Sequence, residues 1–379
     1  MVRSQRFPRD CQGESRVLLT VSGTVPADLD ESIAAGLRPR ADYAEMARRM
    51  SADLLDHAAV RRDQGRLGRV IARFLGPDVC LAWACYRRRQ RYQVIVTDGE
   101  QVGLPLAALF KFTRRRVRAR HLMVVHIMSV RKKASLFRAL RLSSGVDRYI
   151  AYCSAQQRFL AENLGVAPDR IVLRPFMVDT AFFSEQQASL STGPPSRDRP
   201  MICTAGLECR DYPTMLRAVE GLEADVVIAA ASPWSKRASG LDDVRLPPNV
   251  TVVKLGLFEL RQLYQDAAFV VMPLQQVEFQ AGITTILEAM SMGRAVVCTT
   301  TPGQVDTLVD GETGRYVPPS DPIALRATID ELLAHPEKTA RMGVASRAWV
   351  VQHADVEIYA DAISGLVDGL RSPTNVVER

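Results

Sequence analysis

Residues 273–297 contain the residue types that could bind a phosphorylated ligand. An apolar strand ends at Pro273, Gly282 lies in the loop that follows, and a helix is expected over 284–292. A glycine before a helix lets the backbone approach a ligand, and the free N–H groups of the first turn carry about half a positive charge. This pattern predicts an anion site suited to a diphosphate. Its residues would be Gly282, Ile283, Thr284 and Thr285.

Glu288 lies about one turn inside the same expected helix, where its carboxylate could accept hydrogen bonds from sugar hydroxyls. The alternative is an ordinary strand–loop–helix unit with a surface glutamate, and spacing alone does not separate the two. The chain has no Walker A lysine loop, no G-x-S-x-G elbow, no H-E-x-x-H, and no G-x-G-x-x-G after its first strand. These absences disfavour P-loop, serine-hydrolase, zinc-protease and dinucleotide chemistry.

The elements around this segment alternate between strands and helices, which predicts parallel, doubly wound sheets. Short apolar runs mark strands at 16–21, 92–97, 121–125, 148–153 and 171–173, then at 201–204, 224–229, 250–254, 269–272, 295–299 and 314–317. Helical spacing marks 42–59, 103–112, 212–220, 259–267, 284–292 and 322–334. The expected architecture is therefore α/β, with two Rossmann-like domains that face a central cleft.

The polar, Pro-Pro-containing stretch in the middle of the chain predicts a linker. We expect an N-terminal domain over 1–190, a linker at 191–199 and a C-terminal domain over 200–354. Residues 355–379 follow the C-terminal domain as a separate segment.

Composition is that of a soluble globular protein, with 379 residues, 47% hydrophobic and 24% charged. No apolar run reaches the ~18 residues of a membrane span, and the polar N-terminus lacks the core of a signal peptide. Seven scattered cysteines without a C-x-x-C pair fit a reducing compartment. A cytoplasmic location is expected.

Charge is distributed unevenly along the chain. Residues 1–199 hold 34 Lys and Arg against 19 Asp and Glu, whereas residues 200–379 hold 15 against 23. The basic half should meet an anionic partner.

Within residues 111–141, the expected helix 130–142 places Leu136, Phe137 and Leu140 on one face among lysines and arginines, which suits peripheral contact with an anionic membrane. The alternative is a core-facing helix with solvated arginines. The sequence has no strand in which basic residues alternate with aromatic residues, so it does not indicate binding to nucleic acid.

Residues 200–370 resemble the donor domain of retaining glycosyltransferases with the GT-B fold, in the family 4 group (glycosyl transferases group 1). That family carries Glu-x7-Glu, then Ala-Met and Gly-x-Pro-Val, and here Glu288-Ala289-Met290 and Gly293-Arg294-Ala295-Val296 match. The resemblance implies that Glu288 binds the ribose. It also implies that residues 355–379 form a helix that crosses back to the N-terminal domain. Gln280 stands where the family has its first acid, against the donor sugar, and Glu278 is the alternative for that catalytic role.

Further residues take their expected roles from the same resemblance. Arg210 replaces the family's diphosphate-binding lysine, and Gly256-Leu257-Phe258 resembles the turn that contacts the nucleobase. His126, after a central strand, would lie over the donor sugar; the alternative is a histidine that merely caps the strand. Gly23 is what remains of the glycine-rich loop after the first strand, and Lys132 or Lys133 could reach the donor phosphates.

The expected function is therefore transfer of a sugar, with retention, from a nucleotide-diphosphate sugar to an unidentified acceptor. The acceptor could be a small natural product, a lipid or a glycan. Asp242-Asp243 is not the Asp-x-Asp metal motif, so no metal or other cofactor is expected; the helix dipole and Arg210 would stabilise the leaving diphosphate. The alternatives are a GT-B epimerase or phosphorylase, or a nucleotide-sugar-binding protein that has lost catalysis.

Overall fold

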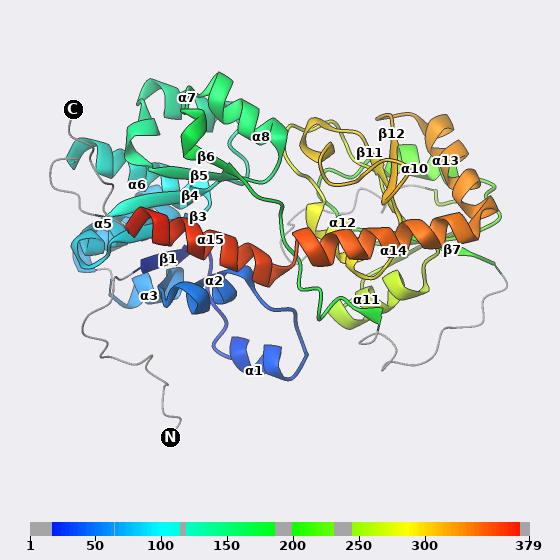
Figure 1. Ribbon diagram of the computed structural model, residues 1–379, viewed down its shortest axis with the longest axis horizontal. Helices are drawn as coiled ribbons and strands as arrows, with labels where there is room; N and C mark the ends of the chain where they lie inside the picture. The colour runs from blue at the N-terminus through cyan, green and yellow to red at the C-terminus, as the bar shows by residue number, and fades with distance from the viewer. Residues whose placement is uncertain (1–16, 64, 114–118, 186–198, 231–244, 372–379) are drawn as a thin grey trace.

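Two six-stranded parallel sheets lie side by side along the long axis of the chain (Figure 1). The computed structural model describes residues 17–63, 65–113, 119–185, 199–230 and 245–371. Three parts of the sequence prediction lie outside these ranges: most of the linker 191–199, the pair Asp242 and Asp243, and four arginines of the basic segment. The α/β prediction of two Rossmann-like sheets is confirmed.

The N-terminal sheet has the strand order β2-β1-β3-β4-β5-β6. Its strands are β1 (Val17–Val21), β2 (Asp53–Asp56), β3 (Val94–Asp98), β4 (Arg120–Val124), β5 (Arg148–Ala151) and β6 (Ile171–Leu173). The helices around it are α1 (Leu29–Ala34), α2 (Asp42–Met50), α3 (His57–Arg62), α4 (Gly65–Leu75), α5 (Pro77–Arg88), α6 (Glu100–Thr113), α7 (Arg131–Ala139) and α8 (Ser154–Arg158). Strand β1 is buried at every position, as expected where helices cover both faces of a sheet.

The C-terminal sheet has the order β12-β11-β10-β7-β8-β9. Its strands are β7 (Met201–Ala205), β8 (Asp225–Ala229), β9 (Val250–Val253), β10 (Val270–Met272), β11 (Val296–Thr299) and β12 (Gly314–Val317). Its helices are α10 (Tyr212–Val219), α11 (Leu257–Asp266), α12 (Ile283–Ser291), α13 (Pro322–Ala334) and α14 (Pro336–His353). The strand order reverses between β7 and β10, and such a switch point is where doubly wound sheets bind ligands.

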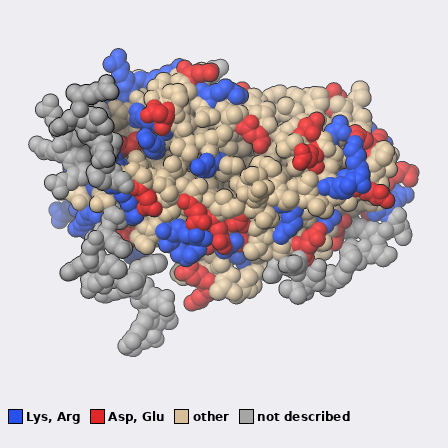
Figure 2. All heavy atoms as spheres, in the orientation of Figure 1, with Lys and Arg blue, Asp and Glu red and all other residues tan. Residues whose placement is uncertain are grey.

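The last helix, α15 (Val356–Arg371), returns to the N-terminal sheet, and Figure 1 shows it following α14 across the molecule. Val356, Tyr359, Ile363 and Val367 belong to the same buried cluster as residues of β1, β3 and β4. Arg49 of α2 pairs with residues of α15, and Figure 2 shows acidic and basic side chains interspersed over these two helices. The end of the chain thereby ties the two domains together.

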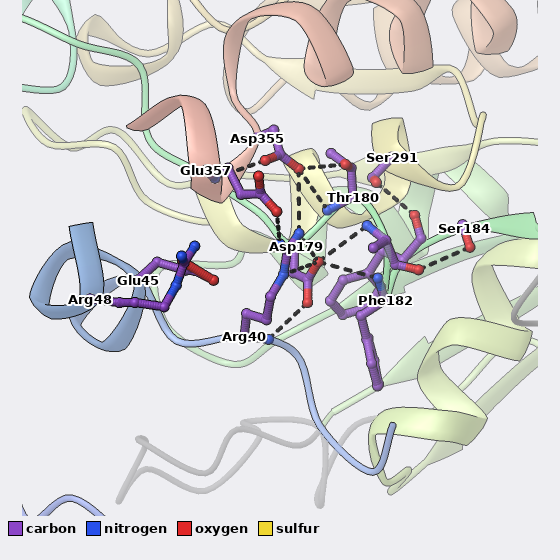
Figure 3. Close-up of polar contacts among 12 residues, drawn as sticks. Arg40, Glu45, Arg48, Asp179, Thr180, Phe182, Ser184, Ser291, Asp355 and Glu357 are labelled. Carbon is purple, nitrogen blue, oxygen red and sulfur yellow. Dashed lines mark hydrogen bonds and ion pairs between the residues drawn. The ribbon is translucent and has the colours of Figure 1, made fainter. Parts of the chain in front are cut away.

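The two crossings between the domains meet at one polar cluster (Figure 3). Arg40 Nη2 lies 2.8 Å from Asp179 Oδ1 on the first crossing. The same guanidinium pairs with Glu357 and lies 3.9 Å from Asp355 on the second crossing. Residues 178 and 355 also form a β-bridge. One arginine from the loop before α2 therefore holds both crossings at the hinge.

The helix predicted over 42–59 is wrong over residues 51–56, and residues 57–59 belong to a separate helix, α3. Helix α2 ends at Met50, Ser51 takes a left-handed conformation with φ of 49°, and β2 then pairs in parallel with β1. Leu54 and Leu55 fit a helical spacing and a short buried strand equally well. The sequence pattern therefore could not separate the two structures.

Candidate functional site

Arg210 and Gly282 meet at the switch point of the C-terminal sheet. Arg210 follows β7 and forms a β-bridge with Leu274, which follows β10. Gly282 precedes α12 with φ of +75°, a left-handed conformation that favours glycine. A Cβ on this glycine would come 3.1 Å from Arg210 Nη1 and 3.0 Å from the Met272 sulfur. The absent side chain therefore lets the backbone at the start of the helix pack directly against the guanidinium.

Arg210 is a buried cation, with 8% of its surface exposed. Its Nε donates to the Ala205 carbonyl at 3.0 Å and its Nη1 to the Glu208 carbonyl at 2.7 Å. Within the ranges that the structure describes, it makes no ion pair with a carboxylate. Burial lowers the pKa of the guanidinium, which shows how poorly its charge is solvated. A buried charge without a counter-ion is costly, and an incoming anion removes that cost.

The first turn of α12 adds a second positive contribution. Gly282 is its N-cap residue and no side chain caps the helix, so the N–H groups of the first turn are available to an anion. Thr284 is exposed here, whereas Ile283 and Thr285 are buried and hold the helix against the core. The N-terminus of α12 and the guanidinium thus lie beside each other, and the anion site predicted here stays a prediction.

Glu288 lies on α12, beyond this first turn, and 8% of its surface is exposed. Its Oε2 accepts a hydrogen bond of 3.0 Å from the hydroxyl of Tyr264, a fully buried residue of α11. Burial raises the pKa of Glu288 to about 7, and the Tyr264 hydrogen bond only partly offsets this. Among the described residues, Oε1 has no hydrogen-bond partner and remains able to accept one.

The turn predicted for the nucleobase begins α11. Gly256 is the N-cap of this helix, and Leu257 and Phe258 follow with 38% and 37% of their surfaces exposed. Since Tyr264 is on the same helix, α11 carries both the exposed turn and the partner of Glu288. Tyr264 was not predicted as a site residue, because the residue spacing of α11 does not show which face of that helix packs on α12.

His126 follows β4, a central strand, at the carboxyl ends of the strands of the N-terminal sheet. Its Nε2 lies 2.8 Å from Oδ1 of Asp98, the last residue of β3, and its backbone N–H donates to Glu100 at 3.0 Å. Burial alone lowers the pKa of His126, but the hydrogen bond and charge of Asp98, with the charge of Glu100, outweigh it and raise that pKa. The ring is thus favoured as a cation, and Asp98 fixes its orientation.

The two lysines after His126 have different surroundings, and their role at the donor phosphates stays a prediction. Lys133 Nζ lies 2.6 Å from the buried carboxylate of Glu100. Lys132 is exposed on α7. Gly23 follows β1 and its carbonyl accepts a hydrogen bond from the His57 backbone at 2.8 Å. Asp98 and Glu100 were not among the residues predicted from the sequence, although they follow the strand predicted over 92–97, and ligands bind after the strands in such sheets.

A pocket of about 220 Å³ lies between the domains. Met128, Ser129 and Gln156 line it from the N-terminal domain, and Glu278, Phe279 and Pro302 line it from the other. The side-chain amide of Gln156 donates to the His126 carbonyl at 2.8 Å, which places His126 next to this pocket. Nearby, Ser154 Oγ donates to Asp306 across the domains at 3.0 Å.

Glu278 and Gln280 differ in their surroundings. Glu278 is exposed at the pocket, whereas Gln280 is half-buried and its Oε1 is buried without a hydrogen-bond partner among the described residues. Gly303 packs against the backbone of Phe279, and Gln304 donates to the Ala281 carbonyl at 2.6 Å, so this loop is held in place. Both side chains thus stand on a fixed loop that leads into α12.

Residues 209–335 match the family model described as Glycosyl transferases group 1. Over this third of the chain, the sequence is therefore similar to glycosyl transferases group 1. The matched range includes Arg210, Gly282 and Glu288, and it includes the turn at the start of α11. The resemblance drawn from the motifs is confirmed for this domain.

One curated relative and several solved structures are similar to the chain. A GDP-mannose-dependent α-(1-6)-phosphatidylinositol monomannoside mannosyltransferase of Mycolicibacterium smegmatis is 34% identical over 85 residues, which is 22% of this chain and 22% of the relative's length. Sucrose-phosphate synthase from Thermosynechococcus elongatus has a TM-score of 0.68 at 17% identity, over 94% of this chain and 99% of its own. HepE of Anabaena in complex with UDP-glucose has a TM-score of 0.67 at 14% identity, and the match covers 94% of this chain and 100% of the HepE chain. These structures share the GT-B fold with this chain.

Proposed function

We propose that this protein transfers a sugar from a nucleotide-diphosphate sugar to an acceptor hydroxyl. The observation that carries the proposal is the buried, unpaired guanidinium of Arg210 beside Gly282 at the start of α12. Among the described residues this cation has no carboxylate partner. In a glycosyl transferase, the diphosphate of the bound donor would be the anion that pairs with it. Glu288 would accept the ribose hydroxyls, and residues 256–258 would contact the base.

The chemistry would take place where the domains meet. The bond between the anomeric carbon and the diphosphate breaks, and Arg210 with the α12 dipole takes up the developing negative charge. These two groups would offset part of the negative charge on the leaving diphosphate, which supports a reaction without a metal. His126, held by Asp98, would donate a hydrogen bond to the donor sugar, and Gln280 or Glu278 would lie against the same sugar from the other side.

Retention is proposed to follow from attack on the same face that the diphosphate leaves. The acceptor hydroxyl forms the new bond at the anomeric carbon, and its proton passes to the departing diphosphate. No protein nucleophile is needed in this scheme. The N-terminal domain would hold the acceptor, at a cytoplasmic location, and closure about the hinge at Arg40 would bring acceptor and donor together.

The proposed peripheral membrane contact through residues 111–141 has mixed support. Lys111, Arg120 and Lys133 already have partners inside the domain, namely the Leu140 carbonyl, Asp147 and Glu100. Lys132 and Arg138 remain exposed on α7. Arg114, Arg115, Arg116 and Arg118 lie outside the described residues. Only some of the positive side chains in this segment are therefore free to contact a membrane.

A donor-hydrolysis experiment tests the proposed function. Purified protein is incubated with GDP-mannose and with UDP-glucose, the donors that the relatives' names mention, and release of the nucleoside diphosphate is measured. Release by the protein and its loss in Arg210→Met support the transferase. Tight binding of a nucleotide sugar without release would favour the binding protein that has lost catalysis, for which the amide of Gln280 in place of an acid is the argument.

A further inference from the structure

Helix α4 (Gly65–Leu75) presents an apolar face that none of the described residues covers. Leu67, Val70 and Phe74 have 56%, 52% and 75% of their surfaces exposed. They stand at positions i, i+3 and i+7, so they share one face of the helix. Single exposed apolar residues are common on proteins, but three that line one helix face form a patch.

The neighbouring face of α4 is purely basic. Arg66, Arg69 and Arg73 also stand at i, i+3 and i+7 and are exposed. The helix contains no acidic residue, and none of these arginines has a carboxylate partner in the described part of the chain. Arg61 and Arg62 of α3, just upstream, are exposed as well. The result is an apolar strip flanked by unpaired positive charge.

The opposite side of α4 is what fixes it to the domain. Gly68 is buried, and its carbonyl accepts a hydrogen bond of 3.3 Å from the Cys80 thiol of α5. Ile71 and Ala72 pack on the buried cluster formed with α5 and α6. The exposed strip is therefore not needed to hold the helix in place, and substitutions there should leave the fold intact.

The charges decide among the partners that could cover this strip. A second copy would bring the same arginines together, which like-charge repulsion disfavours. Residues 1–16 of the chain hold four arginines against two acids, so they too have the wrong sign. A soluble polyanion would satisfy the arginines but leave three large apolar side chains in water. Of these occupants, an anionic bilayer interface is the one that satisfies both faces at once.

We propose that α4 docks the protein on an anionic lipid bilayer, with Leu67, Val70 and Phe74 inserted at the interface and the arginines at the headgroups. Within the described ranges, none of the helices has the length and apolar character needed to cross a bilayer. Docking of this kind needs neither donor binding nor catalysis. If the proposed function also holds, a protein held at a bilayer is suited to a lipid-linked acceptor.

Vesicle sedimentation of the full chain tests this docking. The protein is mixed at low salt with phosphatidylcholine vesicles containing roughly 30 mol% phosphatidylglycerol, and with phosphatidylcholine alone. We expect binding to the anionic vesicles only, with release as salt rises. Replacing Leu67, Val70 and Phe74 by Ser should weaken binding by about tenfold or more, and replacing Arg66, Arg69 and Arg73 by Gln should remove its dependence on salt.

Two control variants make the test specific. Ile323→Ser with Val344→Ser removes apolar side chains that are 81% and 71% exposed on α13 and α14, and this variant should bind like the unmodified protein. Lys132→Gln with Arg138→Gln removes exposed charge from α7 and should weaken binding far less than the α4 variants. Thermal unfolding checks that every variant folds.

Three results would overturn the proposal: no binding of the unmodified protein to anionic vesicles, undiminished binding of the Ser variant, or loss of binding in the α7 variant alone. Binding to heparin without binding to vesicles would likewise reject the bilayer in favour of a soluble polyanion. Titration with nucleoside diphosphates is run separately on the same samples. A failure of the proposed function appears in that titration and leaves the vesicle result unchanged.

Discussion

Arg210 Nη1 lies so close to Gly282 that a single added carbon would come 3.1 Å from it. The arginine comes from the loop after β7 and the glycine from the loop after β10, on either side of the point where the strand order reverses. The proposed diphosphate site depends on this pair, because only a glycine lets the start of α12 approach the guanidinium this closely.

Substituting Gly282 by Ala tests this dependence, and Gly311 provides the control. Both glycines have left-handed backbones, with φ of +75° and +78°, but nothing lies within 4 Å of a Cβ at Gly311. Each substitution should cost about 1–2 kcal/mol of stability through backbone strain. Only Gly282→Ala should also weaken nucleoside diphosphate binding, by about tenfold or more in calorimetric titration. Equal affinities in the two variants would contradict the site.

Arg210 and His126 should have separable effects, since they act on different parts of the donor. Arg210→Met should weaken binding of the free nucleoside diphosphate by ~10–100-fold, the loss of a charge-assisted interaction. His126→Ala should leave that affinity nearly unchanged, because this ligand has no sugar, while turnover falls by ~100-fold. Titration and donor turnover measured on both variants decide the matter. Normal turnover of His126→Ala would make the histidine structural.

Several features of the donor domain were predictable from the sequence. The apolar runs that became β7, β10 and β11 are short, wholly buried strands, whose composition differs clearly from that of the helices between them. Gly282 and the helix after it were predictable because a glycine between a strand and an apolar helix is typical of a left-handed turn into that helix. Arg210 was assigned through the family resemblance, and its lack of a carboxylate partner among the described residues became visible only in three dimensions.

Other features depend on contacts that no local pattern encodes. The hydroxyl of Tyr264 reaches Glu288 from another helix, and Asp98 reaches His126 from another strand. Strand β2 was not predicted, because the positions of Leu54 and Leu55 fit both the helical spacing and the spacing of a short buried strand. The exposed strip on α4 also escaped, because an amphipathic pattern does not say whether its apolar face meets a core or a bilayer.

Arg40 should be important for stability, because it holds both crossings between the domains. Asp179, its main partner, has 5% of its side chain exposed and would lose a buried ion pair in Arg40→Met. The free energy of unfolding should fall by about 2–4 kcal/mol. Arg48, which pairs with Glu45 on the surface of α2 (Figure 3), is the control, and Arg48→Met should cost no more than about 0.5 kcal/mol. Urea unfolding measures both, and equal losses would refute this role.

The protonation of Glu288 should link pH to both stability and nucleotide binding. Burial raises its pKa from 4.5 to about 7, so between these values the folded protein binds a proton that the unfolded chain has released. The free energy of unfolding should therefore fall as pH rises from 4.5 to about 7 and contribute no further change above. Glu288→Gln keeps an oxygen for the Tyr264 hydroxyl but has no proton to lose, so its stability should lack this decline.

Nucleotide binding should show the opposite trend, because the charged carboxylate is the better acceptor for ribose hydroxyls. The affinity of the unmodified protein for its nucleoside diphosphate should rise through pH 7, relative to that of Glu288→Gln. Titration of the ligand's own phosphate is common to both proteins and cancels in the comparison. His126→Ala should retain the profile of the unmodified protein, since His126 does not contact this ligand. Calorimetric titration from pH 5.5 to pH 8.5, roughly one and a half units either side of that pKa, provides the measurement. Parallel profiles for the unmodified protein and Glu288→Gln would show that the ribose hydroxyls bind elsewhere.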